Sequence, residues 1–265
     1  MSRGNGGGRP ILVDPELVAA AVRDASRIDP DMVAILDLLR RVELRTNAYH
    51  RELVGTRPVD DPHVAAFLQR WAAEEMEHGH ALSSVVAARG YPSTEVQLGI
   101  DAQACQAQHR RTMRQNRVIS QLMPSSFLAT HMTVGLMNEW TAHFIYRCLA
   151  DMTGSVPLRQ LLEALSRQES HHAGQYRRRA VEALEQNQTA RVAVRMYLRN
   201  SWSPVGEDVL GVEAQGQIYN YLGQHPKWTH FLDVCDERIG KLPGLNGFTP
   251  WADVQTALEV DQYDR

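Results

Sequence analysis

The sequence predicts an all-helical protein, built on a four-helix bundle with additional flanking and C-terminal helices. Long segments repeat apolar residues at the three- and four-residue spacing of a helix, and none shows the alternation of a half-buried strand. An Asp-Pro pair opens three of these segments, as an N-cap followed by the first helical position would. Four long segments carry a Glu or a Glu-x-x-His pair in phase with their apolar positions, which indicates polar side chains inside the bundle.

Helix starts and stops are clear in the first half of the chain. Residues 1–10 are rich in Gly and predict a disordered tail. Asp14, Asp29 and Asp61 cap the first three helices. Ser93 caps a polar helix, which we expect outside the core or along a partner. The expected helices cover residues 15–26, 30–53, 62–88 and 94–120.

The second half continues with helices and short loops, and residues 11–265 together predict a single domain. Pro124 opens a long helix that stops before Gly154. A loop over residues 242–247, rich in Gly and Pro, precedes the last helix. The expected helices cover residues 124–152, 156–186, 190–200, 208–222, 227–239 and 250–260.

Two overlapping Glu-x-x-His pairs, Glu75/His78 and Glu77/His80, lie in the helix expected over residues 62–88. Residues three apart share one face of a helix and can bind one metal ion together. Trp71 and further apolar residues at heptad-like spacing share the face of the first pair, whereas polar residues share the face of the second. The first pair is therefore predicted to point into the core. A buried carboxylate is costly unless its charge is compensated, and a metal ion would compensate it.

A second pair, Glu169/His172, lies in another apolar stripe, and each pair has a lone core-phased Glu upstream. Glu43 precedes Glu75 by 32 residues, and Glu139 precedes Glu169 by 30. This doubled pattern of Glu and Glu-x-x-His is the ligand set of a four-helix bundle that holds two metal ions bridged by carboxylates.

The donor set of four carboxylates and two imidazoles suits iron or manganese. Four carboxylates nearly neutralise two divalent ions, which lowers the cost of burying them. Two neighbouring iron(II) ions can deliver two electrons to O2, while the protein supplies geometry, supporting hydrogen bonds and a dry cavity.

Residues 71–80, WAAEEMEHGH, resemble the second ligand helix of the soluble acyl-carrier-protein desaturases, a family of the ferritin-like superfamily. That helix has the form Trp-x-Ala-Glu-Glu-x-x-His-Gly-Asp, and His80 stands here in place of the Asp. The resemblance implies a ferritin-like bundle, and the lack of a recognisable plastid transit segment favours a bacterial member. It implies six metal ligands: Glu43, Glu75, His78, Glu139, Glu169 and His172.

The same resemblance implies an O2-dependent di-iron oxidoreductase that desaturates an acyl chain on acyl carrier protein or coenzyme A. Two iron ions per chain, O2 as co-substrate, a ferredoxin-like electron donor and a homodimer follow from it. No catalytic residue beyond the cluster is implied. The helix after Pro124 offers an apolar channel, in which Gly135 and Ala142 are small and would leave room beside the metals. The expected channel residues are Phe127, Met132, Gly135, Leu136, Ala142 and Tyr176.

Two departures from the family pattern keep two alternatives open. Gln168 stands where the family often has an Asp that supports a ligand His, and Ala142 where plant members have a Thr. The first alternative is a di-iron oxygenase that hydroxylates or N-oxygenates a small or carrier-bound metabolite. Some of these enzymes have a third His where this chain has Leu165, which argues against that branch. The second is a non-enzymatic ferritin-like iron-binding protein, although such proteins are usually shorter.

Charge and composition exclude several other classes. A net charge of −3 gives no indication of nucleic acid or of an anionic membrane as a partner. Three separated cysteines predict reduced thiols in a cytoplasm, and no apolar run approaches the length of a membrane span. Arg177–Arg179 predict a solvated face, with docking of an acidic carrier or ferredoxin as the alternative. His143 is a candidate for supporting the metal site, and His131 is expected at the surface or hydrogen-bonded.

Overall fold

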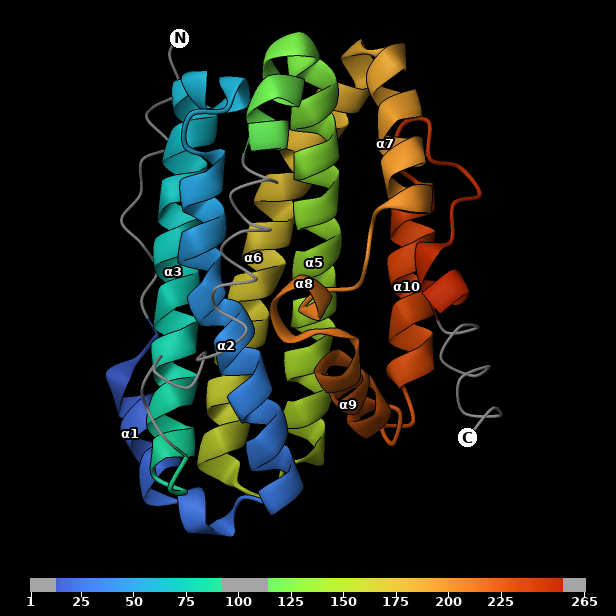
Figure 1. The fold of residues 1–265 in the computed structure, drawn as a ribbon. Coiled ribbons are helices and arrows are strands. Elements are labelled where there is room, and N and C mark those ends of the chain that lie inside the picture. The colour runs from blue at the N-terminus through green and yellow to red at the C-terminus, as the bar shows by residue number, and fades with distance from the viewer. Residues whose placement is uncertain (1–12, 92–113, 255–265) are drawn as a thin grey trace, which may run out of the picture.

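A computed structural model describes residues 13–91 and 114–254, and within these ranges the chain is all-helical, with no strand. Four long helices lie side by side and form the body of the molecule (Figure 1). They are α2 (Pro30–Leu53), α3 (Pro62–Ala87), α5 (Pro124–Met152) and α6 (Val156–Gln186). The most extensive contacts join α2 to α3 and α5 to α6, so each half of the doubled Glu pattern forms one helix pair.

Shorter helices flank this body, as the sequence predicted. α1 (Pro15–Arg23) packs on α6 and α3, while α7 (Gln188–Asn200) and α10 (Trp228–Gly240) pack on α5. α8 (Glu207–Leu210) and α9 (Val212–Leu222) pack on α2. Short 3₁₀ turns cover Ala25–Arg27 and Arg57–Asp60. Among the residues that the structure describes, no helix has the length and apolar character needed to cross a membrane.

The predicted caps explain why the long helices begin where they do. The carboxylates of Asp14, Asp29 and Asp61 each accept hydrogen bonds of 2.8–3.4 Å from backbone N–H groups of the following turn. A Pro follows each Asp and lacks an N–H that would otherwise need a partner. The predicted bounds of α2, α3, α5 and α6 are confirmed to within one residue.

Other boundaries differ from the prediction. The single helix expected over residues 208–222 is broken into α8 and α9 by Gly211, whose φ of 81° leaves the helical region. The first helix ends at Arg23 and continues as a 3₁₀ turn. The polar helix expected over residues 94–120 lies mostly outside the described residues, of which 114–122 are helical. The expected tail over residues 1–10 and the end of the last helix also lie outside them.

Gly79 permits a close approach of α3 to α2 beside the predicted ligands. A Cβ at this position would lie 2.8 Å from side-chain carbons of Leu44 and 3.1 Å from its backbone nitrogen. Since that nitrogen cannot move without α2, we expect Gly79→Ala to lower the free energy of unfolding by roughly 1–3 kcal/mol. Gly174 on α6 is a matched control, because nothing lies within 4 Å of its added Cβ. In chemical denaturation, Gly174→Ala should leave the free energy of unfolding unchanged or raise it by up to about 1 kcal/mol. Equal effects of the two substitutions would contradict a close helix contact at Gly79.

Candidate metal centre

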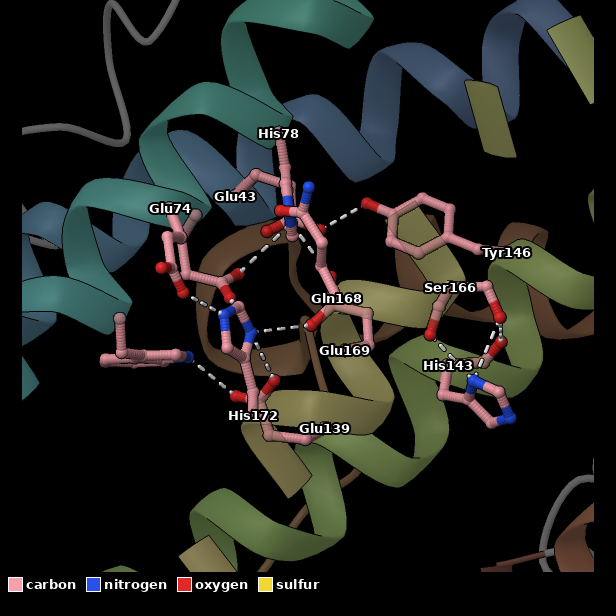
Figure 2. A network of polar contacts seen from close by, with 12 residues as sticks. Glu43, Glu74, His78, Glu139, His143, Tyr146, Ser166, Gln168, Glu169 and His172 are labelled. Carbon is pink, nitrogen blue, oxygen red and sulfur yellow. Dashed lines mark hydrogen bonds and ion pairs between the residues drawn. The ribbon is translucent and has the colours of Figure 1, made fainter. Parts of the chain in front are cut away.

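All six predicted ligands meet in the interior of the four long helices. Figure 2 labels all of them except Glu75. One group of ligand atoms within 4.8 Å of one another comes from Glu43, Glu75, His78 and Glu169. A second group comes from Glu75, Glu139, Glu169 and His172. The two groups share Glu75 and Glu169, which is the arrangement expected of two ions bridged by two carboxylates. Each side chain is at most 6% exposed.

Several carboxylate oxygens converge on one imidazole nitrogen, and a metal cation between them would neutralise their charge better than a single proton. The Nδ1 of His172 lies 2.8 Å from an oxygen of Glu75 and 3.3 Å from oxygens of Glu139 and Glu169. One N–H cannot donate a good hydrogen bond to three carboxylates at once, whereas a metal ion between them can coordinate all three. Among the described residues, four of these buried atoms lack a hydrogen bond of normal geometry: Glu75 Oε1, His78 Nδ1, Glu139 Oε2 and Glu169 Oε1. The donor set therefore fits a pair of metal ions.

Without metal, these groups must share protons. Burial, with the nearby charges of Glu169 and Glu139, raises the pKa of Glu75 to about 7. Burial also holds the pKa values of Glu43 and Glu139 well above their usual range. Burial opposes charge on the two histidines, but the surrounding carboxylates outweigh it and raise both pKa values. Burial would likewise raise the pKa of Glu169, yet its contacts with the histidines lower it instead.

The outer nitrogens of the two histidines have different partners. The Nε2 of His78 lies 2.7 Å from the amide oxygen of Gln168, the position where the family resemblance predicted an Asp. The Nε2 of His172 lies 2.7 Å from a carboxylate oxygen of Glu74. Both contacts leave Nδ1 facing the cluster (Figure 2). Arg70 lies 3.9 Å from the other oxygen of Glu74. Glu74 was not predicted to have a role, although its place in the Glu-Glu doublet of α3 was a signal.

Two further donors hold the unshared carboxylates. The indole Nε1–H of Trp71 donates to Glu139 over 2.9 Å, and the hydroxyl of Tyr146 donates to Glu43. Both donors are buried. Trp71 was predicted only as a core residue, and Tyr146 was not singled out. Tyr146 lies seven residues after Glu139 on the same inward stripe, which was its only signal in the sequence.

The expected acyl channel is filled where it was predicted to be most open. A Cβ at Gly135 would lie 2.3 Å from the ring of Tyr176, so that ring occupies the space that Gly135 leaves free. The expectation that Gly135 leaves room beside the metals was therefore wrong. Met132 and Leu136 are fully buried in the same core, whereas Phe127 and Ala142 are half-buried.

The remaining candidates lie away from the ligand groups. The Nδ1 of His143 lies 2.8–2.9 Å from the backbone oxygen and hydroxyl of Ser166 and thereby joins α5 to α6. Glu77 and His80 lie on the outer face of α3 and line a groove of about 550 Å³ beside α1, which confirms that they point away from the core. Arg177 and its two neighbours are exposed or half-buried, as predicted for a solvated face.

Comparisons with known proteins identify no relative: no family model, no curated protein and no solved structure matches the chain.

The unequal partners of the two histidines should give the two metal positions unequal affinity. A carboxylate makes the imidazole of His172 a stronger donor than the neutral amide makes that of His78. We expect Glu74→Gln to weaken binding at the His172 position by about 10–100-fold. Titration with manganese(II) against a chromophoric chelator measures both affinities. Glu77→Gln, on the outer face of the same helix, is the control and should bind as the original protein does. Equal affinities in the two variants would refute a supporting role for Glu74.

Proposed function

We propose that the protein is an O2-dependent oxidoreductase with two iron ions, built on a ferritin-like four-helix bundle. The observation that carries this proposal is the pair of buried ligand groups sharing Glu75 and Glu169. Oxygen donors predominate in both groups, and each adds one imidazole, a mixture that favours iron or manganese over zinc or copper. When bound, two iron(II) ions supply electrons to O2 and polarise what binds to them.

The chain itself contributes orientation and exclusion of water. Trp71 and Tyr146 fix the unshared carboxylates by hydrogen bonds, and Gln168 and Glu74 fix the histidines so that Nδ1 faces the metals. Met132, Leu136 and Leu165 are fully buried on α5 and α6, the helices that carry Glu139 and Glu169, and such apolar side chains would help to exclude water from the site. A dry site with prearranged ligands strengthens electrostatic interactions with whatever charge develops there.

For the reaction, we propose desaturation of an acyl chain carried by acyl carrier protein or coenzyme A, with electrons from a ferredoxin-like donor. This proposal rests on the resemblance of residues 71–80. In the structure, the ring of Tyr176 must turn away from Gly135 before a chain can pass along α5.

One observation favours the second candidate, an oxygenase of a compact metabolite. The hydroxyl of Tyr176 and the Nε2 of His131 are buried without a hydrogen-bond partner among the described residues. Their rings are 6.1 Å apart, on the stretch where the acyl channel was expected. Two such groups suit a polar substrate better than a methylene chain, because an apolar ligand would leave both unpaired.

Product analysis can separate these candidates. The iron-loaded protein would be given O2, a ferredoxin with its reductase, and acyl carriers of increasing chain length. A desaturase should form an unsaturated product and bind about fourfold more tightly for each added methylene, from about 0.8 kcal/mol of burial. Oxygenation of a compact amine or amino acid, with affinity that ignores acyl length, would support the second candidate instead. Oxidation and retention of many irons without organic product would indicate iron storage. Glu77→Ala, changed on the outer face of α3, away from the side that carries Glu75 and His78, serves as the matched control.

A further inference from the structure

A cluster of aromatic side chains connects the metal centre to α2. Trp71 donates its indole N–H to the ligand Glu139 over 2.9 Å. The ring of Tyr49 lies edge-on to Trp71, with centroids 6.3 Å apart. The hydroxyl of Tyr49 lies 2.8 Å from the Nδ1 of His131 on α5. Tyr49 is half-buried, so the chain of contacts runs from a buried ligand to a partly exposed tyrosine.

Three tyrosines lie near the ligands, and they differ in what could accept a phenolic proton. Loss of one electron makes a phenol strongly acidic, so its oxidation is easy only beside a free base. The hydroxyl of Tyr146 donates to Glu43, which is itself a proposed metal ligand. The hydroxyl of Tyr176 has no partner among the described residues. Among the described residues, Tyr49 is the one of the three whose hydroxyl lies within hydrogen-bond distance of an imidazole, that of His131.

His131 is held in the form that can accept this proton. It is 8% exposed, and burial lowers its pKa to about 4, so the ring is neutral near pH 7. A neutral imidazole has one N–H and one acceptor nitrogen. When the Tyr49 hydroxyl donates to Nδ1, the hydrogen of His131 resides on Nε2, and Nδ1 is the basic atom.

We infer that Tyr49 is a redox-active residue, with Trp71 as its electron relay to the metal centre and His131 as its base. This inference rests on the proposed function, because two bound iron(II) ions and O2 would together supply the oxidant. Tyr49 would lose one electron, and Trp71 would pass it to that oxidant, which would thereby be reduced by one electron. The O–H bond breaks, the proton moves to Nδ1 of His131, and a neutral phenoxyl radical is left. An electron from a ferredoxin-like donor and the proton from His131 restore the phenol. With no substrate bound, this route carries oxidising equivalents away from the ligands.

Electron paramagnetic resonance tests the inference. Protein loaded anaerobically with iron(II) would be mixed with O2 without substrate and frozen at increasing times. We expect a tyrosyl radical signal that narrows when the protein contains ring-deuterated tyrosine. Tyr49→Phe should abolish it, whereas Tyr219→Phe, which removes from α9 a buried hydroxyl without a hydrogen-bond partner among the described residues, should leave it unchanged. His131→Gln keeps a hydrogen-bond acceptor but removes the base, and should reduce the signal at least about tenfold. Trp71→Phe, compared at equal iron content, should delay its formation.

Two further measurements separate failure of the inference from failure of the proposed function. Iron content and the ultraviolet absorption of iron(III) report whether O2 oxidises the bound metal. If the metal is oxidised in every variant but the radical is missing, or persists in Tyr49→Phe, the inference is overturned and the proposed function stands. If no iron binds or none is oxidised, both are overturned. In the metal-free protein, nitrogen NMR should place the hydrogen of neutral His131 on Nε2, with an Nδ1 resonance that shifts in Tyr49→Phe. A hydrogen on Nδ1 would overturn the proton-transfer step.

Discussion

Replacing Glu75 with Ala is expected to remove both metal ions, because this carboxylate belongs to both ligand groups. His78 belongs to the first group alone and His172 to the second alone. After anaerobic loading with iron(II) and desalting, elemental analysis should give about two ions per chain in the original protein. We expect fewer than about half an ion in Glu75→Ala, and about one ion in His78→Ala or His172→Ala.

The control for this series is Glu77→Ala. Glu77 lies on the same helix, two residues from Glu75, but lines the outer groove beside α1. The Glu77→Ala variant should retain about two iron ions per chain. If circular dichroism gives both variants the same helical content, the loss of iron from Glu75→Ala is not caused by unfolding. Equal iron in the two variants would reject the shared role of Glu75. Equal losses in Glu75→Ala and His172→Ala would reject the division into two groups.

The bounds of the four long helices and the buried cluster of four glutamates and two histidines could be predicted from the sequence because both depend on short-range patterns. An Asp before a Pro fixes the start of α2 and of α3 through bonds made within one turn. A Glu-x-x-His pair in phase with apolar residues points inward whatever the neighbouring helix is. Glu75 and His78 could therefore be chosen over Glu77 and His80, and the structure places each pair as predicted.

Contacts between helices could not be predicted in this way. Glu74 on α3 meets His172 on α6, and His78 on α3 meets Gln168 on α6, although the partners are 98 and 90 positions apart in the sequence. Such pairs depend on the rotation and rise of one helix relative to another, which no spacing in a single segment encodes. Tyr49 and His131 are likewise joined only by the packing of α2 on α5.

The same limit explains why the space beside Gly135 was wrongly expected to be open. Gly135 is small, and a small residue beside a ligand helix leaves space only if nothing from the facing helix enters it. The ring of Tyr176 enters it from α6. Composition alone cannot separate a glycine that opens a cavity from one that receives a side chain. The broken helix at Gly211 has a different cause, because a positive φ is available to glycine without strain.

The metal-free protein should lose stability as pH rises, because its buried carboxyl groups must then release their protons. Glu75 has a pKa of about 7 in the folded state, against an ordinary value of 4.5. A raised folded-state pKa means that the folded chain binds the proton more tightly than the unfolded chain, so stability is lost as pH rises through 4.5 to about 7. Glu43 and Glu139 act in the same direction, as do the two histidines above their ordinary value of 6.5. The lowered pKa of Glu169 adds a contribution that is constant above pH 4.5.

Metal binding should reverse this trend, because the ions displace the shared protons and bind more tightly as pH rises. From pH 5 to pH 8, the metal-free protein should lose on the order of 3 kcal/mol through Glu75 alone, or roughly 6–12 °C in Tm. Iron(II) at a hundredfold excess over the Kd of each site should raise the Tm at pH 8 by roughly 10–20 °C. Scanning calorimetry under argon measures both. Glu75→Gln keeps the shape of the side chain without the charge, so its metal-free form should be more stable at pH 8 and less sensitive to pH. A metal-free Tm that rises with pH, or one that iron leaves unchanged, would show that these carboxylates do not form a preassembled cluster.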